Sequence, residues 1–140
     1  MVPSNFHYQY RKNEISTSNQ GKLIIMMYEG AIKFSSMALN SMNSNDIAKK
    51  SLYIRKTHDI INELSLALDR DKGGDVANKL ESLYQFIIRQ LTLANIKSDK
   101  KALESVIRVL TPLLEAWQQL LSQEEDQGEA KPIRSITSKC

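Results

Sequence analysis

The stretch Leu23–Phe34, LIIMMYEGAIKF, is apolar or aromatic at nine of its twelve positions. On a helix the polar residues of this region fall in one stripe roughly 60° wide, and apolar residues cover most of the remaining circle. A helix packed in a bundle needs an apolar face little more than about 100° wide. The stretch therefore predicts a helix with more apolar surface than the core of one bundle requires.

The surplus apolar surface lies on both flanks of the expected core face. Its residues are Met26, Gly30 and Met37 on one side, and Ile25 and Ile32 on the other. Because Gly30 lacks a side chain, it lets a second backbone approach closely, at a cost of about 1 kcal/mol relative to Ala. Three kinds of cover remain open: the chain's own N-terminal segment, another protein, or tight internal packing by a broad-faced helix.

Composition indicates one globular domain. The chain has 140 residues, of which 41% are hydrophobic and 25% charged, so it can build a core without disulfides or metals. A net charge of +3 is too small to indicate nucleic acid. The one cysteine, Cys140, gives neither a disulfide framework nor a cysteine metal site. With no signal-peptide pattern and no apolar run of about 18 residues, we expect a cytoplasmic protein that does not bind a membrane.

Helical spacing of apolar residues in four segments predicts an all-α fold. The expected helices are about 19–42, 46–70, 75–95 and 99–122. Short connections between helices of similar length make neighbours antiparallel, so the pattern predicts an up-down four-helix bundle. We expect the bundle to span residues 18–122, with a mobile N-terminal segment (1–17) and a disordered polar tail (123–140).

The run Asp71–Asp75, DKGGD, is typical of a helix end followed by a helix start. We expect Gly73 to adopt the left-handed conformation and Asp75 to accept hydrogen bonds from the first amides of the next helix. Further along, Phe86 and Leu93 lie off the apolar face of the third helix and predict a second exposed ledge. Several apolar strips on one bundle favour a long amphipathic or partly unfolded partner.

Three stretches resemble the FliS-type flagellar export chaperones. LIIMMYEGAIKF resembles the Leu-Ile-x-Met-Leu-Tyr-Asp/Glu-Gly-Ala motif of that family. Residues 63–99 resemble its Leu-Asp, Gly-Gly, Leu-Tyr and Ala-Asn signature, and Glu115-Ala-Trp117 resembles its Glu-Ala-Trp. The similarity covers roughly residues 8–121.

This resemblance implies a helical bundle that binds the C-terminal segment of flagellin, without catalysis and without a cofactor or metal. Binding would prevent premature polymerisation and keep flagellin competent for flagellar type III export. Contacts with the export machinery or a co-chaperone, and a weak homodimer, stay open. In this family an N-terminal segment, with a tyrosine matching Tyr10, is implied to cover part of the binding surface when no client is present.

Pattern and resemblance together select the site residues. The expected partner contacts are Tyr10, Ile15, Ile25, Met26, Tyr28, Gly30, Ile32, Met37, Phe86 and Leu93. The expected structural residues are Gly73, Gly74, Tyr84, Asn95 and Trp117. The chain departs from the family pattern at His7, at the absence of a Pro before the first helix, and at Pro112, which removes a helical bond to the Arg108 carbonyl.

Other functional classes have less support in the sequence than a flagellin chaperone. His58 is the candidate for a phosphotransfer histidine, but Asp59 follows it, and an adjacent carboxylate repels phosphate. A di-iron bundle needs Glu-x-x-His motifs, and neither histidine has a Glu three residues before it. The basic residues at 49–50 and 55–56 are expected to form a solvated face rather than a nucleic-acid site. A generic helical adaptor or signalling bundle remains the alternative to a flagellin chaperone.

Overall fold

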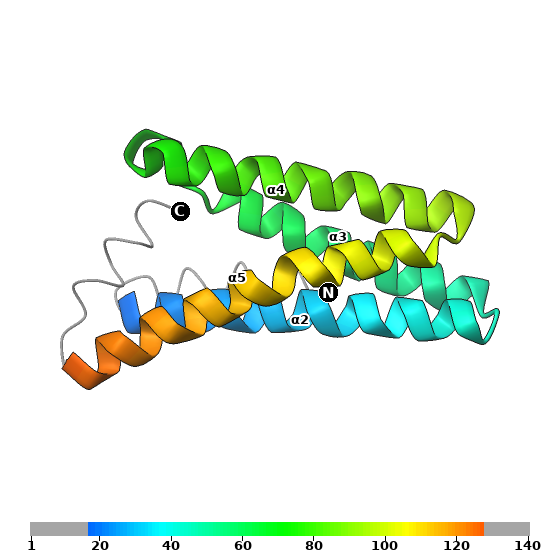
Figure 1. The fold of residues 1–140 in the computed structure, drawn as a ribbon, viewed down its shortest axis with the longest axis horizontal. Helices are drawn as coiled ribbons and strands as arrows, with labels where there is room; N and C mark the ends of the chain where they lie inside the picture. The colour runs from blue at the N-terminus through cyan, green and yellow to red at the C-terminus, as the bar shows by residue number, and fades with distance from the viewer. Residues whose placement is uncertain (1–16, 128–140) are drawn as a thin grey trace.

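The computed structural model describes residues 17–127, which form an antiparallel bundle of four α-helices (Figure 1). The helices are α2 (Thr17–Asn43), α3 (Ile47–Leu66), α4 (Arg70–Lys97) and α5 (Lys100–Gln127). Each helix packs against the next, and α5 packs back against α2. The predicted all-α up-down bundle is confirmed.

Residues 1–16 of the predicted N-terminal segment and residues 128–140 of the predicted tail lie outside the described residues, whereas Thr17 is the first residue of α2. The tail was expected to begin at Gln123, but α5 continues through this residue to Gln127, so that boundary was wrong. Residues 123–127 are rich in Gln and Glu, which are good helix formers, and this stretch contains neither Gly nor Pro. The helix also continues past Pro112, whose exposed ring lies on the solvent side.

The breadth of the apolar face of α2 follows from its two neighbours. Helix α2 packs against α3 and α5, and these are the two most extensive interfaces of the bundle. Gly30 lies against α3, where an added Cβ would come within 3.3 Å of Ile60 Cδ1. On the opposite flank, Ile25 and Ile32 are half-buried and pack against the core. Internal packing therefore accounts for much of the surplus apolar surface, and Gly30 makes room for a side chain of α3.

Two tyrosines join the diagonal helices α2 and α4 through the centre of the bundle. Tyr28 is completely buried and Tyr84 is 2% exposed. Their hydroxyl oxygens lie 2.5 Å apart, and either one can donate the hydrogen bond. Because α2 and α4 do not approach each other through their backbones, this pair fixes their relative position from inside.

A lysine holds the turn between α4 and α5 against the start of α3. Lys50 is only 5% exposed, and its Nζ donates to the carbonyl oxygen of Asn95 at 3.0 Å and to Ser98 Oγ at 2.9 Å. Beside it, Ser51 Oγ donates to Asn95 Oδ1 at 3.0 Å. A cation is favourable at a helix C-terminus, where the last carbonyl groups lack helical partners.

Aspartates begin three of the helices. Asp46 Oδ1 accepts from the amide of Lys49 at 3.1 Å, and Asp69 Oδ1 accepts from the amide of Lys72 at 3.0 Å. Asp99 Oδ1 accepts from the amides at positions 101 and 102, in agreement with the predicted start of the fourth helix at about residue 99. Asp75 was expected to begin the third helix, but α4 begins six residues earlier behind the Asp69 cap, and the non-helical Gly74 lies directly before Asp75.

The middle turn also differs from the prediction at its glycines. Helix α3 ends at Leu66, and α4 contains a kink at Gly74, where φ is 52° and ψ is −131°. Gly73 instead donates its amide to the Asp69 carbonyl at 2.6 Å, inside the first turn of α4. Gly74, not Gly73, has the positive φ, because the capping turn starts before the glycine pair.

The first prediction concerns the tyrosine pair. Tyr28→Phe and Tyr84→Phe should each lower the free energy of unfolding by about 1–2 kcal/mol, since each removes one hydroxyl from a buried hydrogen bond while keeping the ring. The double variant should lose less than the sum of the single losses. Urea unfolding of the four proteins measures this coupling. Strictly additive losses would show that the two hydroxyl groups do not depend on each other.

The second prediction concerns the kink. Gly74→Ala should destabilise the bundle by about 1–3 kcal/mol, because φ and ψ at this position are unfavourable for a residue with a Cβ. No atom lies within 4 Å of the added Cβ, so the loss would report backbone strain alone. Asn78→Ala, an exposed substitution in the same helix, is the control and should not destabilise. Equal thermal stability of both variants would contradict the assignment.

Candidate partner-binding surface

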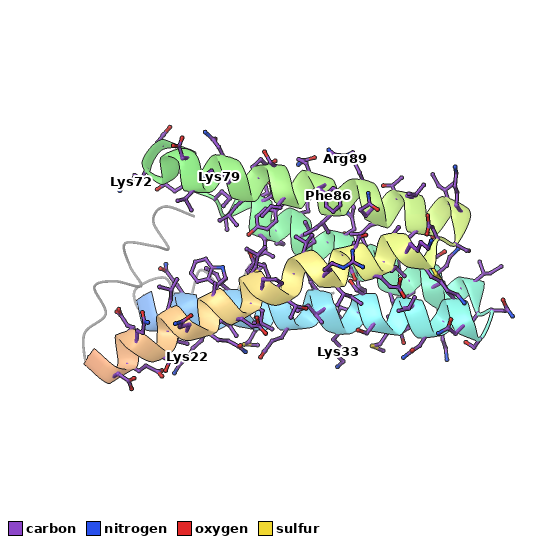
Figure 2. The ribbon with its side chains drawn as sticks, viewed as in Figure 1. Lys22, Lys33, Lys72, Lys79, Phe86 and Arg89 are labelled. Atoms are coloured by element: carbon purple, nitrogen blue, oxygen red, sulfur yellow. The ribbon has the colours of Figure 1, made fainter. Side chains whose placement is uncertain are left out.

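Met26 is the most exposed of the described residues that the sequence assigned to a partner. It is 50% exposed and lies in one line along α2 with Lys22, Glu29 and Lys33, which are also exposed. Figure 2 shows Lys22 and Lys33 on the outer side of α2. Met26 therefore interrupts the polar stripe, whereas the sequence placed it beside the stripe.

The other predicted contacts on α2 are less accessible. Ile25, Gly30, Ile32 and Met37 are half-buried. Tyr28 is completely buried and bonded to Tyr84, so the structure places it in the core rather than on a surface. Trp117, predicted to be structural, is also buried. Tyr10 and Ile15 lie outside the described residues.

The predicted ledge on α4 is partly covered by the bundle itself. Phe86 and Leu93 are half-buried and pack against the edge of the core. In Figure 2 Phe86 lies on the side of α4 that faces the other helices. By helical spacing both residues lie away from Thr92 and Asn95, which face α3. The ledge is thus a partly apolar margin of the α4–α5 face, and its contact with a partner stays a prediction.

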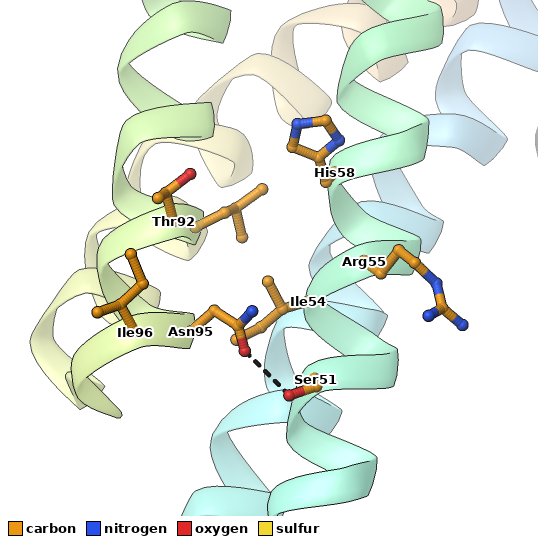
Figure 3. Close-up of a pocket in the computed structure, with 8 residues that line it drawn as sticks. Ser51, Ile54, Arg55, His58, Thr92, Asn95 and Ile96 are labelled. Carbon is orange, nitrogen blue, oxygen red and sulfur yellow. Dashed lines mark hydrogen bonds between the residues drawn. The ribbon is translucent and has the colours of Figure 1, made fainter.

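A surface groove between α3 and α4, which the sequence analysis did not predict, has a volume of about 360 Å³ (Figure 3). Its lining residues are Ser51, Ile54, Arg55, His58, Leu91, Thr92, Asn95 and Ile96. Ile54 and Leu91 are core residues and form the apolar floor. Ile96, at 75% exposure, is an exposed apolar residue of the lining.

Short side chains create this groove. Ser51 and Thr92 occupy positions between α3 and α4 where a leucine would fill the space, and this interface is the least extensive of the four. Figure 3 shows Arg55 directed away from α4, which leaves the groove unfilled. The signal in the sequence was the presence of small polar residues beside apolar ones on two helices that become neighbours.

His58 belongs to this groove rather than to an open helical surface. It is half-buried and lies across the groove from α4. A phosphotransfer histidine needs an accessible imidazole, so the position of His58 agrees better with a wall of a binding groove.

Among residues 17–127, no helix has the length and the apolar character that a membrane span requires.

Sequence comparisons with known proteins show the family of this chain. A sequence model of the family described as "Flagellar protein FliS" matches residues 4–124. The flagellar secretion chaperone FliS of Campylobacter jejuni is 36% identical over 115 residues, which cover 82% of this chain and 90% of that protein. The Bacillus subtilis protein of the same name is 30% identical over 124 residues, 89% of this chain and 92% of that protein. The Salmonella typhimurium protein of the same name is 33% identical over 110 residues, which cover 78% of this chain and 82% of that protein. With a match over most of its length, this chain belongs to the FliS family of flagellar secretion chaperones.

Proposed function

We propose that this protein binds the C-terminal segment of flagellin in the bacterial cytosol. The bound segment is kept from premature polymerisation and stays competent for flagellar type III export. The proposal is supported by family membership and by one structural observation, the unfilled groove between α3 and α4. The protein acts by binding, and the proposal assigns no catalytic step to His58 or to any other residue.

The groove has the properties of a site for an amphipathic helix. A helix laid between α3 and α4 can place apolar side chains spaced by three or four residues on Ile54 and Leu91. Ser51, Thr92 and Asn95 supply polar groups at the sides of the groove. The exposed Ile96 gains cover when such a helix binds, which contributes free energy in proportion to the apolar area removed from water.

Met26 lies elsewhere on the molecule. It is on the outer stripe of α2, whereas the groove lies between α3 and α4. A single straight helix does not contact both places, because α2 and α4 are diagonal in the bundle. A segment that uses both must pass around the bundle, in agreement with a client held in several extended or helical pieces.

The third prediction tests the groove. Thr92→Trp should fill it and weaken binding of a flagellin C-terminal peptide by at least about tenfold, or 1.4 kcal/mol. Arg89→Trp adds the same side chain on the exposed side of α4 and should bind like the wild type. Calorimetry measures the affinity, and circular dichroism checks the fold. A folded Thr92→Trp protein with wild-type affinity would remove the groove from the site.

The fourth prediction tests the stripe on α2. Met26→Lys should leave the bundle folded, because the new ammonium group stays in water, but should weaken peptide binding by about 1–3 kcal/mol if flagellin covers this position. Asn40→Lys on the same exposed stripe is the charge control. Ala31→Lys, at a completely buried position, should unfold the protein. If the wild-type protein itself does not bind the peptide, the proposed function is wrong.

A further inference from the structure

Charged side chains are separated along the length of the bundle. The α2–α3 and α4–α5 turns lie at the same end (Figure 1), so residues 31–56 and 85–113 form the half next to these turns. That half holds ten Lys or Arg against three Asp or Glu, whereas residues 17–30, 57–84 and 114–127 hold four against eleven. The bundle therefore has one basic half and one acidic half, although the net charge of the chain is only +3.

Exposed lysines concentrate around the two turns, and we call this region the basic end. Its exposed lysines are Lys49, Lys97, Lys100 and Lys101. The neighbouring aspartates are turned toward backbone amides: Asp46 caps α3, and Asp99 caps α5. Because capping directs these carboxylates at the helix starts, the lysine ammonium groups dominate the surface that a partner would meet.

An apolar residue and a hollow accompany the lysines. Ile47 is 69% exposed and borders a hollow of about 250 Å³. The other lining residues of the hollow are Ser41, Met42, Asn45, Asp46, Lys50, Ser98 and Lys100. Small-molecule sites are typically about 300–1,000 Å³, so this volume suits one side chain of a protein partner better than a metabolite. Basic and apolar groups are thus available side by side.

The hollow is preformed, because hydrogen bonds hold the turns around it. Lys50 ties the start of α3 to Asn95 and Ser98, and the amide of Asp46 donates to the Ser41 carbonyl at 2.8 Å in the α2–α3 turn. Both turns that frame the hollow are therefore held by hydrogen bonds. A preformed site loses little conformational entropy on binding.

We propose that the basic end binds an acidic protein segment that places an aliphatic side chain in the hollow beside Ile47. Carboxylates of the segment would meet Lys49, Lys100 and Lys101. A lipid surface is too flat to enter the hollow, and a nucleic acid would leave Ile47 in water. The hollow and the α3–α4 groove share no lining residue, so the acidic segment and the groove-bound flagellin segment would not compete for the same side chains.

The probe is a labelled synthetic peptide of Glu and Leu residues, compared with one in which Ser replaces Leu and one in which Gln replaces Glu. The full-length protein should bind the first peptide, bind the Ser peptide more weakly, and not bind the Gln peptide. Affinity should fall steeply between about 50 and 300 mM salt, since exposed charges are screened over a shorter distance at higher ionic strength. Fluorescence anisotropy measures each affinity.

Charge reversal has a matched control at the opposite end. Lys49 and Lys72 both occupy the third position after an aspartate cap, and both are exposed. A Glu in the first turn is favourable for a helix, so neither Lys49→Glu nor Lys72→Glu should impair folding. Lys49→Glu should weaken peptide binding, and Lys72→Glu should not. Lys49→Glu combined with Lys100→Glu and Lys101→Glu should weaken it by at least about tenfold.

Several results would overturn the proposal. These are no binding of the Glu–Leu peptide, equal binding of the Gln peptide, or full binding by the folded triple variant. Equal loss in Lys49→Glu and Lys72→Glu would show a general charge effect rather than a site. Binding to anionic phosphatidylglycerol vesicles in place of the peptide, lost in the triple variant, would assign this end to a membrane surface instead. Ile47→Ser should abolish only the preference for Leu over Ser, and an unchanged preference would contradict the role of the hollow.

Discussion

The contact between the hydroxyl groups of Tyr28 and Tyr84 sets the cross-section of this bundle. Four antiparallel helices leave a diagonal distance that no backbone contact spans, and two long rings meeting end to end cross it. A buried hydroxyl is costly without a partner, and these two hydroxyl groups bond to each other at a matching height. The register of α4 relative to α2 follows from this bond, and aliphatic side chains at these two positions would leave it less defined.

The position of α4 in turn determines the surface available to a partner. Tyr84 holds α4 from within, and Ser65 Oγ donates to Glu81 Oε1 at 2.5 Å near its middle. The bonds of Lys50 hold its far end. With α4 fixed at these places, Ser51 of α3 and Thr92 of α4 are too short to close the space between the two helices, and the groove remains. The same bundle thus combines a rigid interior with unfilled apolar surface, which suits a protein that must bind a long segment while staying folded.

Much of this architecture was predictable from the sequence, and the errors have identifiable physical causes. Periodicity gave the number and type of the helices, and Asp99 gave the start of α5. The position of the positive φ was wrong by one residue, because cap chemistry at Asp69 competes with the glycine pair for the start of α4. The apolar width of α2 could not be divided between core and partner from one helix alone. Which apolar residues of α2 belong to the core depends on the helices that pack beside it. At Gly30 the neighbour is Ile60 of α3, so this position belongs to the interior of the bundle. The groove depends on two helices at once, so no single stretch indicated it.

The groove between α3 and α4 lies between two hydrogen-bonded cross-links of these helices. Near the α4–α5 turn, the bond from Lys50 to the Asn95 carbonyl and the Ser51–Asn95 bond join α3 to α4. Near the opposite end of α3, the bond from Ser65 to Glu81 joins the same two helices. The width of the groove is therefore set from both sides. A helix bound in a groove of fixed width would be selected for the size of the side chains that face the floor, while the side chains on its outer face would be free to vary.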